Sequence, residues 1–560
     1  MKKLLYISFA VAPVLFATSC IEEIDPQSST VSKDQVANAP GSTDKLTAAI
    51  TSQMTGSPLY GSTPSDYAWD FGYTTTFIWR NVMGQDMVNL DDNTNWYSTW
   101  AYCGTGLGPA YAICQAPWTY YYGFIKNCNN VISTIPAEHA TGQDKINLGI
   151  AHAMRAMFYM DLARMYCPTT YGKDPQALTV PIVTEKTTIA MATNNPQATN
   201  EKMFEFILED LTKAEDELAD YKRADVYTPD LSVVYGLKAR AYLTMEKWAD
   251  AEKYAKLAQN GYTPMTGAQY TDRETGFNSP NGAWMFGTTF KSNDPCITQN
   301  DGDSSWGSWM VMEITEQGAM GYAANYGVPF HIDRHLYNTI PATDIRKDCF
   351  VSFDVPDMSD TEAIEYCREH YSDYPETLVG INQNAGYNYG CGGLSVKFRP
   401  AGGDAGHNDV SIGFCVAVPY MRVEEMMLIE AEAAGMQDEG RGINLLTSFA
   451  QLRDPSYTYG QHNETYQSDY ATAFQNEVWW QRRVEFWGED VSYWDIKRLQ
   501  KGIIRSYEGT NHPADTQWNT TTPPQWMTFC FVGTETSYNI AIVQNPTPER
   551  PTTDSPKYNF

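Results

Sequence analysis

The amino-acid sequence predicts a mainly α-helical protein, with a helical-repeat scaffold built from both ends of the chain, large irregular loop regions and a few short strands. Three observations lead to this fold class. Apolar residues recur at helical spacing in segments on both sides of the middle of the chain. Between about residues 260 and 410 this periodicity disappears, and Gly, Asn, Asp, Ser and Tyr dominate. Only 19% of the 560 residues are charged, against about 25% in ordinary globular proteins, which excludes a charge-rich disordered chain.

The N-terminus has the three parts of an export signal. Two lysines precede an apolar run from Leu4 to Phe16, and small residues then lead to Cys20. The run is shorter than the roughly 20 residues of a membrane helix, so we predict a signal peptide over residues 1–19. Small residues ending in Cys resemble a bacterial lipoprotein box, in which the Cys thiol is acylated. Cys20 is therefore the predicted lipidation site, and an ordinary secretory signal with an incidental Cys is the alternative.

The chain after the signal is expected to be a tether followed by one domain. Pro, Gly, Ser and Thr fill the stretch up to about residue 42, which predicts a flexible linker. Ten cysteines beyond Cys20 are too sparse for a disulfide framework, although Cys103, Cys114 and Cys128 are close enough to pair. The predicted divisions are the acylated Cys and tether over 20–44 and a single domain over 45–560, with helical scaffold at about 118–260 and 415–505 and irregular loops at about 60–117 and 260–410.

Two amphipathic helices are predicted before residue 220. In Ile150–Tyr166, apolar residues fall at i, i+3 and i+4, with Arg155, Asp161 and Arg164 among the polar positions. In 203–218, Phe and the aliphatic residues fall on one side and acidic residues on the other.

A helical hairpin is predicted over 233–258, with its turn near Glu246. Tyr and Ala residues there fall at the positions that a tetratricopeptide repeat reserves for its closely packed helices. One repeat cannot bury its own apolar face, so partner helices must exist. The candidates are the helical segments 150–166, 423–434 with 443–452, and 474–499.

Aromatic residues are concentrated in two polar, irregular regions. Sixteen lie between Tyr60 and Tyr122, about a quarter of that stretch, and the whole chain has 37 Tyr and 15 Trp against 22 Phe. Flat rings stack on the C–H faces of sugars, while Asp, Asn, Gln and Arg bond the hydroxyls, so exposed Trp beside Asn or Asp suits sugar binding. The predicted ligand-binding residues are Trp96, Trp100, Trp306 and Trp309, with Tyr97, Tyr102, Tyr322 and Tyr326 as second choices. The alternative is that these rings pack under long loops as small additional cores.

The sequence contains no motif that supports catalysis, metal binding or nucleic-acid binding. The formal net charge of −28 disfavours nucleic acid and anionic lipid as partners, and mildly favours neutral or cationic ligands. There is no G-x-S-x-G elbow, and His331 and His335 lack the Glu of H-E-x-x-H. We therefore predict a protein that is not an enzyme, with no catalytic residues, no metal and no cofactor. A glycan hydrolase remains an alternative, because 67 acidic residues allow many carboxylate pairs.

Several segments together resemble the SusD/RagB family of outer-membrane nutrient-binding lipoproteins. The helix 151–162 is similar to the family's R-A-x-x-Y-x-x-L motif, and 419–433 to its P-x-x-R-x-A-E-x-x-L-x-x-A-E-A motif. Residues 481–498 look like its near-C-terminal charged box, except that Asp490 replaces Gly and Ser492 replaces Arg. These two departures put the local helix packing in doubt. Gln544-Asn545-Pro546 resembles the family's terminal Q-N-P.

The resemblance implies a cell-surface protein that captures oligosaccharides and hands them to a SusC-like TonB-dependent transporter. It also implies a location at the outer membrane, facing the exterior, with membrane attachment only through the lipid anchor and with the irregular regions as ligand-binding loops. Peptide capture, as in RagB-like members of the family, is the alternative cargo.

Overall fold

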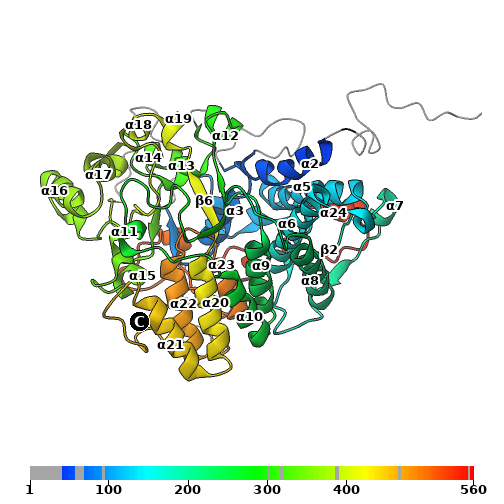
Figure 1. Ribbon diagram of the computed structural model, residues 1–560. Helices are drawn as coiled ribbons and strands as arrows, with labels where there is room; N and C mark the ends of the chain where they lie inside the picture. Colours follow the sequence, from blue (N-terminus) through cyan, green and yellow to red (C-terminus); the bar gives the residue numbers. More distant parts are fainter. Residues whose placement is uncertain are drawn as a thin grey trace, which may run out of the picture.

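The computed structural model is mainly helical, as predicted, with three short two-stranded sheets among the described residues (Figure 1). It describes residues 39, 41–56, 69–90, 95–299, 302–315, 321–384, 390–463, 468–552 and 555–560. The predicted signal peptide and Cys20 lie outside this part of the chain. No helix in the described ranges is long and apolar enough to cross a membrane.

The helices follow the predicted order, with long ones toward both ends and short ones in the middle. Those before residue 260 are α2 (Ser42–Ser52), α3 (Thr75–Met83), α4 (Ser98–Tyr102), α5 (Ala112–Thr134), α6 (Gln143–Tyr166), α7 (Ile189–Ala192), α8 (Asn200–Glu217), α9 (Leu231–Thr244) and α10 (Trp248–Ala258). Those of the middle region are α11 (Gly267–Tyr270), α12 (Pro295–Thr298), α13 (Trp306–Met310), α14 (Tyr322–Asn325), α15 (Arg334–Thr339), α16 (Asp360–His370), α17 (Pro375–Asn384), α18 (Gly403–His407) and α19 (Val410–Gly413). Those after it are α20 (Val423–Gly435), α21 (Glu439–Ala450), α22 (Ala473–Glu485), α23 (Ser492–Arg498) and α24 (Gly533–Tyr538).

The predicted hairpin is confirmed as α9 and α10, and it joins the two ends of the chain. Glu246 forms the turn with a positive φ of 57°. Helix α10 packs against both α9 and α20, and α20 packs against α21 and α22. Ala251, Ala255 and Ala258 are fully buried, so small side chains let these helices approach closely.

Helix α6 is more deeply buried than its pattern suggested. It packs between α5 and α8, and Arg155 and Asp161 are buried rather than facing water. Arg155 donates from Nε to Asp210 on α8 at 2.7 Å and from Nη1 to Glu185 at 2.8 Å. The polar positions are therefore matched by ion pairs inside the scaffold, which is how a buried helix can carry charges.

The segment 474–499 is a pair of helices, α22 and α23, separated by a turn. Gly488 and Asp490 both have positive φ there, 79° and 68°. The two departures from the family motif keep the helices packed: Asp490 binds Arg80 on α3 at 2.5 Å, and Ser492 donates to Asp86 at 2.8 Å.

Three antiparallel strand pairs tie distant segments together. Their members are β1 (Met87–Asn89) with β5 (Phe330–Ile332), β2 (Leu178–Pro181) with β3 (Gln197–Thr199), and β4 (Trp284–Thr289) with β6 (Ala417–Arg422). The first pair brings the N-terminal irregular region against the middle region. The third leads directly into α20, so the middle region is anchored on the helical scaffold.

All ten cysteines of the described residues are free, so Cys103, Cys114 and Cys128 do not pair. Each of these three is buried, and burial raises the pKa of the Cys103 thiol to about 12. They pack as small hydrophobic side chains.

Candidate functional site

The structure places four of the eight predicted ligand-binding residues inside the core. Trp100, Trp306, Trp309 and Tyr97 are fully buried. Trp100 stacks on Trp79 with ring centroids 5.1 Å apart, and Trp306 meets Phe398 edge to face at 5.4 Å. Since their faces are covered by other rings, these four cannot stack on a ligand in this structure, and the alternative of rings packed under loops describes them.

Local polarity misled the prediction for these rings. Ser98 and Thr99 beside Trp100 are half-buried, whereas Trp100 itself is fully buried. A signal was present at Trp309, since Met310, Val311 and Met312 follow it as a continuous apolar run and all are buried.

Three of the other predicted residues meet in one aromatic cluster, which we define as Trp96, Tyr322 and Tyr326. Trp96 and Tyr326 are exposed by 38% and 42%. The Trp96 indole Nε1 donates to the Tyr322 hydroxyl at 2.5 Å, and the Tyr322 and Tyr326 rings lie 4.5 Å apart. The two irregular regions singled out in the sequence therefore do meet, and they meet through aromatic residues.

The aromatic cluster stands on a fixed base. Asn95 donates from Nδ2 to the carbonyl of Val328 at 3.2 Å, close to the β1–β5 pair. The backbone N–H of Tyr322 donates to Ser308 Oγ at 2.6 Å, and the buried Trp309 ring stacks below Tyr322 at 4.8 Å. Each exposed ring is therefore backed by hydrogen bonds or buried rings rather than by a loose loop.

Gly321 is required immediately before α14. Its φ is 85°, and a Cβ there would come within 2.7 Å of the Phe414 ring. A larger residue would displace α14 and with it Tyr322, so this glycine sets the position of the cluster.

The remaining predicted residue, Tyr102, lies apart from the cluster. The guanidinium of Arg550, from the C-terminal segment, lies over its ring at 4.4 Å. One face of Tyr102 is therefore occupied by a cation–π contact.

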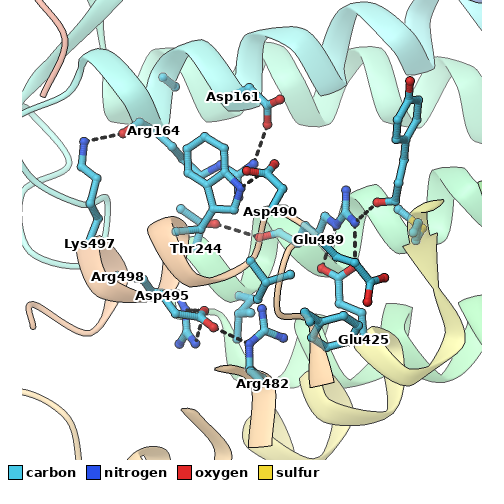
Figure 2. A pocket seen from close by; sticks show the side chains of 18 of the residues that line it. Asp161, Arg164, Thr244, Glu425, Arg482, Glu489, Asp490, Asp495, Lys497 and Arg498 are labelled. Carbon is cyan, nitrogen blue, oxygen red and sulfur yellow. Dashed lines mark hydrogen bonds and ion pairs between the residues drawn. The ribbon is translucent and has the colours of Figure 1, made fainter. Parts of the chain in front are cut away.

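A second candidate is a narrow charged crevice between the two halves of the scaffold (Figure 2). Helices α3, α6, α8, α9, α20, α22 and α23 and strand β6 contribute side chains to it, and its cavity volume is about 60 Å³. That volume holds a few water molecules. The labelled charged residues in Figure 2 are Asp161, Arg164, Glu425, Arg482, Glu489, Asp490, Asp495, Lys497 and Arg498.

The carboxylates of this crevice are held in ion pairs. Glu425 binds Arg240 at 2.6 Å, and Asp495 binds Arg482 at 2.6 Å. Burial raises the pKa of the Asp490 carboxyl to about 6, and the bidentate contact with Arg80 keeps it paired at neutral pH. The arrangement suits a structural joint, since its acids are committed to arginines rather than placed as a general acid and base.

Lys497 fills one side of the same crevice without an ion-pair partner among the described residues. Its ammonium donates to the carbonyls of Arg164, Cys167 and Met527 at 2.5, 3.1 and 2.9 Å, which caps the end of α6. Burial lowers the pKa of Lys497 to about 7.

A third hollow is a polar depression of about 260 Å³ in the middle region. Tyr374 stacks on His407 there with ring centroids 3.5 Å apart and donates to Asp404. It lies just before α17, which packs against α14, so it belongs to the same lobe as the aromatic cluster. No set of three or more His, Cys, Asp or Glu in the described ranges could hold a metal ion.

The fold and these sites define a class: a helical-repeat protein whose irregular region presents exposed aromatic rings. Two family profiles match the chain, one described as "Starch-binding associating with outer membrane" over residues 29–243 and one described as "SusD family" over residues 277–558. The second covers just over half of the chain, and the chain therefore belongs to the SusD family. No curated protein matches it significantly in sequence.

Solved structures of this family share the fold along nearly their whole length. A SusD-like carbohydrate-binding protein from Bacteroides vulgatus is 21% identical with a TM-score of 0.67, covering 90% of this chain and 97% of its own. A SusD superfamily protein from Bacteroides thetaiotaomicron is 17% identical with a TM-score of 0.63, covering 92% and 100%. Surface glycan-binding protein A from Bacteroides thetaiotaomicron, in complex with laminarihexaose, is 15% identical with a TM-score of 0.60, covering 90% and 98%.

Proposed function

We propose that this chain is a cell-surface lipoprotein that binds oligosaccharides on the aromatic cluster and passes them to a TonB-dependent outer-membrane transporter. The observation that carries the proposal is the meeting of Trp96, Tyr322 and Tyr326 across two distant segments, with two of the three rings exposed. Family membership supports a binding role, and a structurally similar protein holds laminarihexaose.

The proposed contact is stacking of a sugar ring on Trp96 or Tyr326. The Trp96 N–H is engaged by Tyr322, so the indole is held in one orientation before a ligand arrives. A fixed ring loses little side-chain entropy on binding, which favours affinity. Asn325, exposed beside Tyr326, is placed to bond a hydroxyl.

The test is calorimetry with laminarihexaose and a panel of neutral oligosaccharides. For a glycan that the wild type binds, Trp96→Ala and Tyr326→Ala should each weaken binding by about 1–3 kcal/mol, roughly 5- to 150-fold, by analogy with base stacking. Tyr326→Phe keeps the ring and should keep the affinity. Tyr470→Ala is the matched control, because Tyr470 is similarly exposed at 37% but lies outside the cluster.

Two results would count against this site. Binding that survives both alanine substitutions would place the ligand elsewhere, and binding to peptides but to no glycan of the panel would favour the alternative cargo. Reducing-sugar release from a bound glycan would instead support a hydrolase.

The membrane part of the proposal rests on Cys20 and on the family description of association with the outer membrane. Labelling cells with a radioactive fatty acid should mark the wild type and not Cys20→Ala. Protease applied to intact cells should degrade the wild-type chain if it faces the exterior. A chain protected in intact cells but cut after lysis would contradict that orientation.

A further inference from the structure

The polar depression of the middle region, which we call the polar hollow, is built from segments that are distant in sequence. Its volume is about 260 Å³, whereas a single water molecule needs about 10–15 Å³ of such space, so an organic ligand fits. The ligand-binding residues predicted from the sequence lie elsewhere, so the hollow is a separate candidate. The side chains that line it include Arg273, Glu274, Asp373, Tyr374, Asp404 and His407.

Two carboxylates of the polar hollow have no cationic partner among the described residues. Glu274 is exposed, and its carboxylate forms no ion pair and no hydrogen bond there. Asp404 is exposed as well, and it accepts one hydrogen bond, from the Tyr374 hydroxyl at 2.5 Å. The hollow therefore carries two negative charges that its own residues do not neutralise.

The other charged side chains of the polar hollow are already paired. Arg273 donates from Nη1 to Asp373 at 2.9 Å and from Nη2 to the carbonyl of Glu369 at 2.7 Å. Glu313 is buried at the hollow, and both of its oxygens accept from Arg399 Nη1 at 2.8 Å. Because each of these pairs cancels its own charge, the hollow as a whole attracts a cation.

His407 gives the polar hollow one more hydrogen-bond acceptor. Its side chain is only 5% exposed, and its Nδ1 lies 2.6 Å from the carbonyl oxygen of Glu313. A carbonyl only accepts, so Nδ1 carries the proton, and Nε2 of the neutral ring is an acceptor. Nε2 has no partner among the described residues. A buried acceptor without a partner costs free energy, so a ligand that donates a hydrogen bond is favoured here.

The imidazole of His407 is held in place on two sides. The backbone N–H of Thr315 donates to the carbonyl of His407 at 2.7 Å, and the Tyr374 ring stacks on the imidazole with centroids 3.5 Å apart. Gly406 allows this close packing, because a Cβ there would lie 1.6 Å from the carbonyl oxygen of Ala401. The acceptor is therefore fixed before a ligand arrives, which lowers the entropy cost of binding.

These groups suit a ligand that has several donors and a positive charge. An ammonium group donates three hydrogen bonds and accepts none, and the half-buried ring of Tyr374 adds an aromatic surface that attracts cations. No three His, Cys, Asp or Glu of the described ranges form a set that could hold a metal ion. Glu274, Asp404 and His407 are therefore better reached by separate donors of one larger ligand, such as the amine and the hydroxyls of a sugar.

We propose that the polar hollow binds the ammonium group of an amino sugar in the captured glycan. This inference rests on the proposed function, which makes a glycan the cargo, and it specifies a cargo with free amines. Tyr374 lies directly before α17, and α17 packs against α14, which carries Tyr322 of the aromatic cluster. In Figure 1 α14, α17 and α18 lie together, so one lobe presents both surfaces to the same oligosaccharide.

The test is calorimetry with the full chain and three β-1,4-linked hexasaccharides that differ only in the group on one carbon of each unit. Their units are glucosamine, N-acetylglucosamine and glucose, so only the first carries free amines. At pH 7 these amines are mostly protonated, by analogy with the α-amino group, whose pKa is about 7.7–8.0. The glucosamine hexamer should bind at least tenfold more tightly than the other two.

A double variant tests whether the polar hollow causes this preference. Glu274→Gln/Asp404→Asn removes both free charges at nearly constant volume, and it should bind the glucosamine and glucose hexamers about equally. Both side chains are exposed, so the fold should be retained. The matched control is Asp357→Asn/Glu365→Gln, which removes two exposed carboxylates of the middle region outside the hollow. It should keep the preference, whereas an effect of net charge alone would act equally on both double variants.

Failure of this inference and failure of the proposed function give different results. No binding of the glucosamine hexamer, or a preference that survives in Glu274→Gln/Asp404→Asn, would overturn the amine site. The proposed function would still stand if Trp96→Ala weakened the binding of another glycan. No binding of any glycan would overturn both. A lysine-rich peptide that binds the wild type but not the double variant, without binding of the glucosamine hexamer, would assign the hollow to peptides and overturn the inference.

Discussion

The ion pair between Arg80 and Asp490 offers a sharp test of how the two halves of the scaffold are joined. Asp490 has a φ of 68°, a conformation that glycine adopts without strain, and the SusD-like motif resembled here has glycine at this position. Its carboxylate accepts from Arg80 Nε and Nη2 at 2.5 and 2.6 Å. Arg80 lies on α3 and is fully buried, so the pair links segments 410 residues apart.

Two opposing free energies decide the effect of Asp490→Gly. Removing the side chain relieves backbone strain of about 1–2 kcal/mol. It also leaves the Arg80 guanidinium buried without a carboxylate, which costs about 3–5 kcal/mol. The hydrogen bonds from Arg80 to Tyr121 at 2.7 Å and Thr76 at 2.8 Å remain, but they do not neutralise the charge. We therefore expect a net destabilisation of roughly 1–4 kcal/mol.

Companion variants separate the two contributions, with unfolding followed by calorimetry and by urea titration. Asp490→Asn tolerates positive φ and removes only the charge, so it should destabilise at least as much as Asp490→Gly. Glu246→Gly is the control for strain, because Glu246 also has positive φ, and among the described residues it accepts a hydrogen bond from Tyr470 and has no buried charge partner. It should lie within about 1 kcal/mol of the wild type. The double variant Arg80→Met/Asp490→Gly should recover most of the loss, since no buried charge is left unpaired.

The reasoning would be refuted if Asp490→Gly were as stable as the wild type. That result would mean that the pair contributes no more than the strain it imposes. Equal destabilisation by the single and double variants would show that packing, and not the unpaired charge, accounts for the loss.

Other predictions concern buried titratable groups. The pKa of Lys497 is about 7 in the native state and 10.5 in the unfolded chain, so only the unfolded chain holds this proton between pH 7 and 9. The free energy of unfolding of the wild type, relative to that of Lys497→Met, should therefore rise by up to about 1.4 kcal/mol per pH unit in that range. A difference between the two proteins that does not change with pH in urea titrations would contradict this. Burial lowers the pKa of His331 to about 4, so stability should fall as the pH drops from 6.5 toward 4, and His331→Gln should reduce that fall. In the unacylated protein, Cys415 is the partly exposed thiol of the described residues and should react first with a thiol reagent; mass spectrometry that finds Cys103 or Cys114 labelled as fast would show that the core opens.

The scaffold was predictable because its signal is periodic and local. The helices at 150–166, 203–218 and 233–258, and those at 423–434 and 443–452, all form within a residue or two of the expected positions or inside longer helices. Burial of Arg155 and Asp161 was not predictable, because Arg155 pairs with Asp210 on α8, and Asp161 accepts hydrogen bonds from Tyr73 and Tyr121, which are distant in sequence. Periodicity reports which face is apolar, and it does not report whether a polar face finds a charged partner.

The candidate site was predicted at the level of regions and only partly at the level of residues. Trp96, Tyr322 and Tyr326 form the aromatic cluster, in which Trp96 and Tyr326 are exposed, whereas the four buried rings belong to the core. The difference arises from the tertiary structure: Trp309 sits beneath Tyr322, and Tyr97 meets Trp309 edge to face at 4.8 Å. In short helices between loops, polar neighbours in sequence say little about which rings are covered by distant segments.

The many Tyr and Trp residues of this chain therefore have two roles, and substitutions in the two groups should have different effects. Tyr73 and Tyr121 both donate to the buried Asp161, at 2.6 and 2.9 Å, so their hydroxyl groups complete the hydrogen-bond network of the charged crevice. Trp96 and Tyr326 keep an exposed surface above a base held by the β1–β5 pair. Removing the ring of Tyr73 or Tyr121 leaves the buried Asp161 carboxylate with one hydrogen-bond donor fewer and should lower the stability of the fold. Removing an exposed ring of the cluster should lower ligand affinity while stability changes by no more than about 0.5 kcal/mol, so the ratio of the two effects identifies the role of each ring.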